Sequence, residues 1–287
     1  MRRVRSGAAR AVLASVAMAV PEDTQRIIEP LLADAGSSAV LLDLDGTLAP
    51  IVERPGDVRI PEVLRQLLPL IATRFGLLAF ISGRAINGLR GIVGLDGVAY
   101  SGNHGLEIRL ADGRRLPSPD AAGRGGALRA FARRWAPGEL GRCGIWLEDK
   151  GATLTFHYRA AADPGRAVDV LEQEVAPAAQ AAGLVAAPGR MSLEIHPTAD
   201  VTKGTAARAL LQATPGIRHA ISFGDDRTDV EVWRALRALT AEGRLATGLG
   251  VGVTSDESPL EVLAEADVLV AGVAGVEELL HRFARTA

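Results

Sequence analysis

The chain has 287 residues, which is sufficient for two domains or one large domain with a sizeable core. Its formal net charge of −2, without any long basic run, argues against nucleic acid as the main partner. Its single cysteine, Cys143, excludes a disulfide within the chain and fits a reducing compartment.

The N-terminal segment combines Arg2, Arg3 and Arg5 with an apolar stretch over residues 11–20. This order resembles a secretory signal, but the stretch is too short to span a membrane. It is also rich in alanine and weakly hydrophobic, so a short helix or an extension fits equally well. We expect residues 1–36 to be an N-terminal extension with a helix, and the protein to be cytoplasmic.

A strand predicted over Ala39–Leu44 leads into D-x-D-G-T, which begins at Asp43. Side chains alternate along a strand, so Asp43 and Asp45 are expected on the same side at its carboxyl end. Gly46 allows a sharp turn whose N–H groups can face an anion. The pattern suits phosphoryl transfer, in which one carboxylate attacks phosphorus, the other moves protons and a divalent cation screens the charge. A strand that ends in an acidic turn is also common, so other motifs must decide.

A second apolar strand, Leu77–Ile81, ends in Ser82, Gly83 and Arg84. A serine hydroxyl and adjacent N–H groups at a strand end can hold a phosphate oxygen. Alternatively, Ser82 is only a helix N-cap. The remaining elements predicted around this strand are a helix at Pro61–Arg74, a helix at Ala85–Val93 and a strand at Val98–Ser101.

The pattern changes between Ile108 and Ala199, where strands of period two lie among helices. This predicts a small α+β domain inserted between two halves of a larger one. The predicted strands are Trp146–Glu148, Thr153–Arg159 and Met191–His196, and the predicted helices are Leu128–Trp135 and Gly165–Ala182.

After the insertion, Lys203 opens a helix at Gly204–Gln212. A lysine at a helix start opposes the helix dipole and points to an anionic partner, although a solvated surface lysine is an alternative. A strand at Ala220–Gly224 then ends in an acidic cluster that requires a cation or nearby basic groups. Hard oxygen ligands and phosphate chemistry favour Mg²⁺. The cluster consists of Asp225, Asp226 and Asp229.

Strands and helices alternate on both sides of the insertion, which predicts an α/β fold: a parallel sheet with helices on both faces and sites at the carboxyl ends of its strands. We assign residues 37–107 and 200–287 to this core and residues 108–199 to the inserted domain. The last predicted elements are a helix at Thr228–Leu239, strands at Leu249–Val253 and Val268–Val270, and a helix at Gly275–Phe283.

D-x-D-G-T, a later S-G-R, a lysine and G-D-D-x-T-D, in this order, resemble the four motifs of the haloacid dehalogenase superfamily. The resemblance implies a Rossmann-like core, an inserted cap and Mg²⁺ as cofactor. It implies that Asp43 is a nucleophile that forms an aspartyl-phosphate and that Asp45 is the general acid and base. The remaining implied roles are phosphate binding by Thr47, Ser82, Gly83 and Lys203, metal binding by Asp43, Asp45 and Asp225, and support from Asp226 and Asp229.

Three further stretches, G-N-H-G from Gly102, L-E-D-K-G from Leu147 and L-E-I-H-P from Leu193, resemble the trehalose-6-phosphate phosphatase family. The resemblance covers about Ala39–Leu280 and implies hydrolysis of trehalose 6-phosphate to trehalose and phosphate in trehalose biosynthesis. One departure is His196, where the family pattern leads us to expect arginine. The implied sugar-binding residues are Glu148, Lys150 and Glu194, with Asn103, His104 and Arg159 lining the same cavity.

Other assignments stay open at this point. The first alternative is a related capped phosphatase for another phosphosugar, such as sucrose phosphate or mannosyl-3-phosphoglycerate. A non-catalytic phosphosugar-binding module is the second. Without the family pattern, a solvated turn before a strand is the better interpretation of Glu148–Lys150. We expect a monomer whose partner is a small phosphosugar, and neither nucleic acid nor a membrane.

Overall fold

The computed structural model describes residues 22–52, 54–117, 121–135, 139–189, 191–197 and 200–285. The segment that resembles a secretory signal lies outside the described residues. Helix α2 (Glu22–Ala33) is the first described helix, and its Ile28 and Leu31 are fully buried. The extension predicted for residues 1–36 therefore packs as part of the fold from α2 onwards. Among the described helices, none combines the length and apolar character that a membrane crossing requires.

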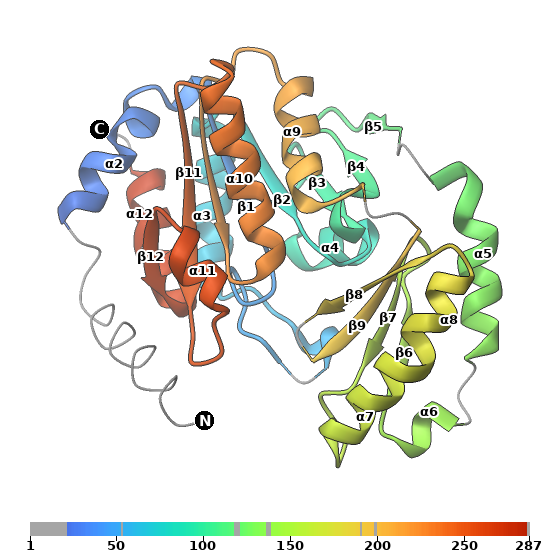
Figure 1. The fold of residues 1–287 in the computed structure, drawn as a ribbon. Helices are drawn as coiled ribbons and strands as arrows, with labels where there is room; N and C mark the ends of the chain where they lie inside the picture. Colours follow the sequence, from blue (N-terminus) through green and yellow to red (C-terminus); the bar gives the residue numbers. More distant parts are fainter. Residues whose placement is uncertain are drawn as a thin grey trace.

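A parallel sheet forms the centre of the larger part of the molecule, as the sequence predicted (Figure 1). Its strands lie in the order β12-β11-β10-β1-β2-β3, so β1 lies between β2 and β10. The parallel pairing brings the carboxyl ends of these strands to one edge of the sheet. The strands are β1 (Ser38–Leu42), β2 (Leu77–Ile81), β3 (Ala99–Gly102), β10 (His219–Gly224), β11 (Thr247–Thr254) and β12 (Val268–Ala271).

Helices cover both faces of this sheet, and the alternation along β1 shows why. Val40 and Leu42 belong to one hydrophobic cluster, whereas Ala39 and Leu41 belong to the other. Because both faces are buried, β2 is a continuous apolar run, and so is β1 after its first residue. The first face packs against α2, α3 (Glu62–Arg74), α4 (Ile86–Val93) and α12 (Gly272–Ala284), and the second packs against α9 (Lys203–Ala213), α10 (Arg227–Ala241) and α11 (Leu260–Glu265).

Two short antiparallel strands extend the sheet beyond β3. They are β4 (Glu107–Arg109) and β5 (Arg115–Leu116). The boundary predicted at Ile108 falls inside β4. We therefore refer below to residues 117–199 as the insert and to the rest as the core.

The insert contains an antiparallel sheet in the order β6-β7-β9-β8, with helices on the side away from the core (Figure 1). The three predicted strands correspond to β6, β7 and β9, and β8 was not predicted because its A-A-P-G run lacks a period of two. The strands are β6 (Trp146–Asp149), β7 (Leu154–His157), β8 (Val185–Gly189) and β9 (Ser192–His196), and the helices include α5 (Ala121–Arg134) and α6 (Glu139–Arg142).

The single helix predicted over Gly165–Ala182 is interrupted. It consists of α7 (Pro164–Val170), a π-helical turn over Leu171–Val175 and α8 (Ala176–Ala181). Pro177, the second residue of α8, has no N–H to donate, which accounts for the wider turn before it. The helix buries Leu171 and Val175 against the insert sheet.

Candidate active site

A cavity of about 1160 Å³ lies between the carboxyl ends of β1, β2 and β10 and the insert sheet. It brings together most of the residues that the motifs singled out, although they are far apart in the sequence. From the core these are Asp43, Asp45, Ser82, Gly83, His104, Lys203, Asp225 and Asp226, and from the insert they are Glu148, Lys150, Arg159 and Glu194.

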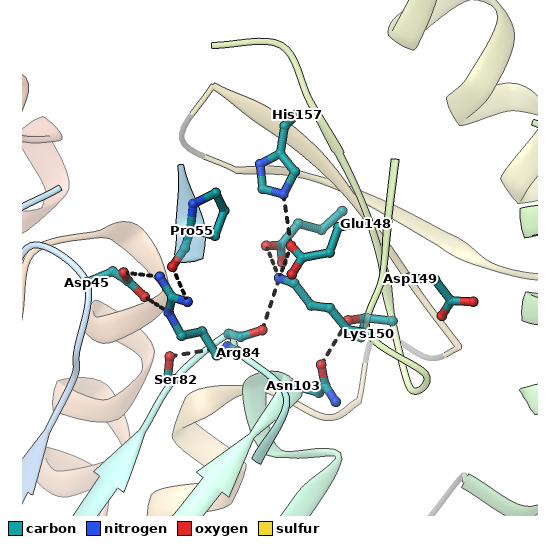
Figure 2. A network of polar contacts seen from close by, with 12 residues as sticks. Asp45, Pro55, Ser82, Arg84, Asn103, Glu148, Asp149, Lys150 and His157 are labelled. Carbon is teal, nitrogen blue, oxygen red and sulfur yellow. Dashed lines mark hydrogen bonds and ion pairs between the residues drawn. The ribbon is translucent and has the colours of Figure 1, made fainter. Parts of the chain in front are cut away.

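Three of the predicted site residues lie behind the cavity wall. Asp229 is buried and holds Lys203 from behind. Thr47 is fully buried, and its hydroxyl has no hydrogen-bond partner within the described part of the chain. Asn103 is fully buried too, and its side chain donates to Glu107 at 2.8 Å. Its side-chain oxygen accepts from Thr153 at 3.1 Å (Figure 2), so Asn103 joins core and insert.

Lys203 lies between two buried carboxylates. Its Nζ donates to Oδ1 of Asp43 at 2.7 Å and to Oδ1 of Asp229 at 2.8 Å. The other oxygen of Asp229 accepts the backbone N–H groups of Asp225 and Asp226 at 3.2 and 3.1 Å. Both oxygens of Asp229 are thus engaged, one with Lys203 and the other with the turn after β10.

Charge at this site is poorly balanced. Burial raises the pKa of Asp43 well above its ordinary value. The charge of Lys203 opposes this shift most strongly, and the neighbouring carboxylates Asp229, Asp225 and Asp45 add to it. Burial lowers the pKa of Lys203, but Asp229 and Asp43 outweigh it and raise the pKa above its ordinary value. Lys203 therefore stays charged, and a further positive charge beside Asp43 would favour the ionised form of that carboxyl group.

The carboxylates are suitably placed for a divalent cation. Asp43, Asp225 and Asp229 each have a carboxylate oxygen within 4.8 Å of the others, and all three are buried. A Cβ on Gly46 would approach an oxygen of Asp225 to 2.0 Å, so only glycine at this position lets the Asp225 carboxylate lie against the D-x-D-G-T turn. Carboxylate oxygens are the ligands that a hard cation such as Mg²⁺ prefers, so the chemistry of this group fits such an ion.

Asp45 faces Arg84, which the sequence analysis did not include among the site residues. The guanidinium donates to Oδ2 of Asp45 at 2.6 Å and to Oδ1 at 2.8 Å, and it also donates to the carbonyl of Pro55 at 2.9 Å (Figure 2). Pro55 opens a short 3₁₀ helix, Pro55–Asp57, that borders the cavity. The Ser82 hydroxyl accepts the N–H of Arg84 at 3.2 Å, so it stabilises this turn and does not cap α4.

Core and insert meet at Gly83 and His104. A Cβ on Gly83 would come within 2.4 Å of Nε2 of His104, so the imidazole packs directly on the glycine backbone. His104 has φ +55°, which is uncommon for a residue other than glycine. Its Nε2 lies 2.7 Å from an oxygen of Glu194. From the insert, Lys150 donates to the carbonyl of Gly83 at 3.1 Å.

The insert contributes two carboxylates with low pKa values. Burial raises the pKa of Glu194. The charge and hydrogen bond of His104, the hydrogen bond of His196 and the charge of Lys150 outweigh it and hold the pKa well below its ordinary value. Burial acts similarly on Glu148, where the hydrogen bond from His157 at 3.0 Å and the charge of Lys150 lower the pKa. Both carboxylates are charged at neutral pH and border the cavity.

His196 replaces the expected arginine and contacts the same carboxylate. Its Nε2 lies 3.4 Å from Oε2 of Glu194, and its ring lies edge-on to His104 with centroids 5.4 Å apart. Two imidazoles, one from the core and one from the insert, thus share one carboxylate.

The chain is similar to phosphatases of trehalose phosphate. The trehalose-phosphatase family model matches residues 41–262. A probable trehalose-phosphate phosphatase of Sinorhizobium fredii is 33% identical over 238 residues, which cover 80% of this chain and 84% of the relative. An uncharacterized glycosyl hydrolase of Mycobacterium tuberculosis is 32% identical over 225 residues, and the match spans 76% of this chain but only 16% of that much longer protein.

The fold agrees with this relationship. The C-terminal domain of trehalose-6-phosphate phosphatase from C. albicans superimposes with a TM-score of 0.72 at 21% identity, over 93% of this chain and 99% of that one. With the family model covering most of the chain, this protein belongs to the trehalose-phosphatase family.

Proposed function

We propose that this protein hydrolyses trehalose 6-phosphate to trehalose and phosphate, as a step of trehalose biosynthesis, with Mg²⁺ as cofactor. The observation that supports this most directly is the arrangement of the cavity. At the core edge, Asp43 and Asp45 lie beside Lys203 and Arg84, and across the cavity the insert presents a polar group suited to sugar hydroxyls. A phosphosugar fits both halves at once.

In the proposed reaction Asp43 is the nucleophile. One of its carboxylate oxygens bonds to phosphorus, and the bond between phosphorus and the sugar oxygen breaks. Asp45 donates a proton to the leaving oxygen. Water then attacks the aspartyl-phosphate, Asp45 accepts a proton from that water, and phosphate leaves with the Asp43 carboxylate restored.

Lys203 and the turn at Ser82 and Gly83 are placed to bind the phosphoryl group. Lys203, held by Asp229, presents a fixed positive charge beside Asp43. Ser82 and Gly83, at the end of β2, border the same part of the cavity. When bound by Asp43 and Asp225, Mg²⁺ would supply the charge that this acidic site lacks and screen the nucleophile from the phosphate.

We propose that the insert acts as a cap that excludes water and selects the sugar. Glu148, Lys150 and Glu194 form one polar group: Lys150 lies 3.9 Å from Glu148 and 3.8 Å from Glu194. Charged groups held in this way recognise hydroxyls strongly, and a sugar of the wrong shape leaves them unpaired. Arg159 borders the same cavity.

The test is phosphate release from trehalose 6-phosphate, sucrose phosphate, mannosyl-3-phosphoglycerate and an aryl phosphate, with Mg²⁺ and with a chelator. We expect Mg²⁺-dependent hydrolysis with a preference for trehalose 6-phosphate, and loss of activity in Asp43→Asn. Preference for another phosphosugar would keep the chemistry and reject the proposed substrate. Substrate-induced thermal stabilisation without turnover would indicate a binding module.

A further inference from the structure

One large apolar side chain in the cavity has no role in the reaction described above. Trp146, the first residue of β6, is 52% exposed and borders the cavity. Large apolar side chains left exposed in a concave, otherwise polar site commonly mark a ligand surface. Trp146 is also part of the insert sheet, so its position does not depend on a mobile loop.

The strand geometry places the indole beside the sugar-binding carboxylate. Along β6, Leu147 packs into the core of the insert, so Trp146 and Glu148 on either side of it face the cavity. His157 lies directly opposite Trp146 on β7. The imidazole and the indole are stacked, with centroids 4.9 Å apart and an interplanar angle of 23°.

His157 fixes both neighbours. While its ring stacks on the indole, its Nε2 is 3.0 Å from Oε2 of Glu148 (Figure 2). One face of the indole is therefore covered by His157, while Trp146 as a whole stays 52% exposed at the edge of the cavity. An apolar aromatic face thus lies next to a charged acceptor, and both are held by the same imidazole.

This pairing matches the chemistry of a glucopyranose ring. Its equatorial hydroxyls form a polar rim, and the C–H groups leave its two faces comparatively apolar. A carboxylate accepts hydrogen bonds from the hydroxyls of the rim, and an aromatic ring packs against the C–H groups of one face. If the sugar made only hydrogen bonds to Glu148, its apolar face would stay exposed to water.

We propose that Trp146 is a specificity-determining residue that stacks on the sugar ring distal to the phosphate, with His157 as a positioning residue for both Trp146 and Glu148. This rests on the proposed function, because it takes the substrate to be a phosphorylated disaccharide of glucose. It adds an aromatic contact to the polar group of Glu148, Lys150 and Glu194.

Intrinsic fluorescence gives a test that requires no turnover. The chain has three tryptophans, and of these Trp233 is fully buried and Trp135 packs partly buried on Phe131 away from the cavity. Titration of trehalose into the wild-type protein should change the emission of Trp146. The change should disappear in Trp146→Phe and persist in Trp135→Phe, which is the matched control because it also removes one indole from the insert.

Kinetics gives the second readout. In Trp146→Ala the KM for trehalose 6-phosphate should rise about 3- to 10-fold, which corresponds to the energy of one aromatic contact. Trp146→Phe should retain most of the affinity, and Trp146→Leu, which keeps apolar bulk without the ring, should resemble the alanine variant. His157→Ala should raise this KM as well, and Trp135→Phe should leave it unchanged.

The outcomes show whether the role of Trp146 fails alone or together with the proposed function. If the wild-type protein hydrolyses trehalose 6-phosphate but Trp146→Ala has an unchanged KM, Trp146 does not stack on the sugar and the proposed function stands. If trehalose changes the tryptophan emission equally in wild type and in Trp146→Phe, stacking of Trp146 on the sugar is likewise rejected. If the wild-type protein neither hydrolyses trehalose 6-phosphate nor binds trehalose, both the proposed function and the role of Trp146 in sugar binding are rejected.

Discussion

Arg84 and Asp45 form a bidentate ion pair at the edge of the active site, and both nitrogen–oxygen distances are below 3 Å. The pair occupies both oxygens of the carboxylate that we assign as general acid and base. At least one of its hydrogen bonds must therefore open before Asp45 can exchange a proton with substrate or water. Because Arg84 also holds the Pro55 carbonyl, opening the pair is coupled to the loop that borders the cavity.

We expect Arg84→Ala to lower kcat/KM for trehalose 6-phosphate by about 10- to 100-fold, the range for loss of a charge-assisted contact of roughly 1.5–3 kcal/mol. Arg84→Lys should recover only part of this, because an ammonium cannot bind both oxygens in a planar fork. Steady-state kinetics measures both. The control is Arg114→Ala, which breaks an exposed pair with Asp112; full activity in Arg84→Ala would show that Asp45 needs no such support.

Asp43→Asn should abolish turnover and also stabilise the metal-free protein at pH 7. The pKa of Asp43 is raised on folding, so its ionisation opposes folding: the contribution of the neutral group is fully present below the unfolded pKa of about 3.9 and is lost as pH rises through the folded value. An amide keeps the neutral state at every pH. We expect a higher Tm than wild type at pH 7 and a smaller difference at pH 4.

The thermal comparison needs a chelator throughout, because a bound cation stabilises only the protein that retains its carboxylate. Equal Tm values for wild type and Asp43→Asn at pH 7 would mean that the neighbouring basic groups, Lys203 foremost, compensate the Asp43 charge. Activity in Asp43→Asn within about 10³-fold of wild type would remove Asp43 as the nucleophile.

Glu148→Ala should lower kcat/KM for trehalose 6-phosphate about 10- to 100-fold, because a charged hydrogen-bonding group is lost from the sugar site. Hydrolysis of an aryl phosphate, which lacks the sugar, should fall much less. Asp149→Ala is the matched control, since its side chain points away from this group (Figure 2). Equal losses on the two substrates would contradict a role for Glu148 in sugar recognition.

Gly83→Ala should disturb the junction between core and insert. The new methyl group would displace the His104 imidazole, and with it the contact to Glu194. We expect kcat/KM to fall by roughly 10- to 100-fold, as for other small displacements of binding groups. Gly88→Ala serves as control because a Cβ there meets nothing within 4 Å. Comparable activity of the two variants would show that His104 has room to move.

The low pKa of Glu194 predicts a pH-dependent stabilisation. A carboxyl group whose pKa is depressed on folding contributes stability above its unfolded pKa, here about 4.3, and loses that contribution as pH falls through the folded value. Wild type should therefore have a higher Tm than Glu194→Gln at pH 6, and the difference should shrink towards pH 3. An exposed substitution, Glu172→Gln, should show no such trend.

The sequence by itself determined the core and the catalytic edge. Apolar runs such as Leu77–Ile81 identify buried strands from their local pattern, and parallel pairing must then bring the strand ends to one edge. That rule alone brings Asp43, Ser82 and Asp225 to one cavity, and the helix start at Lys203 joins them.

Only the tertiary structure decided which side chains meet. Arg84 reaches Asp45 across 39 residues, and Asn103 turns inwards to Glu107 and Thr153 instead of facing the cavity. Trp146 reads as an ordinary strand residue until its exposure and the His157 stack are known. Local periodicity determines the face that a side chain takes, but its partners come from other segments of the chain, so pairings of this kind appear only once the core and the insert are folded against each other.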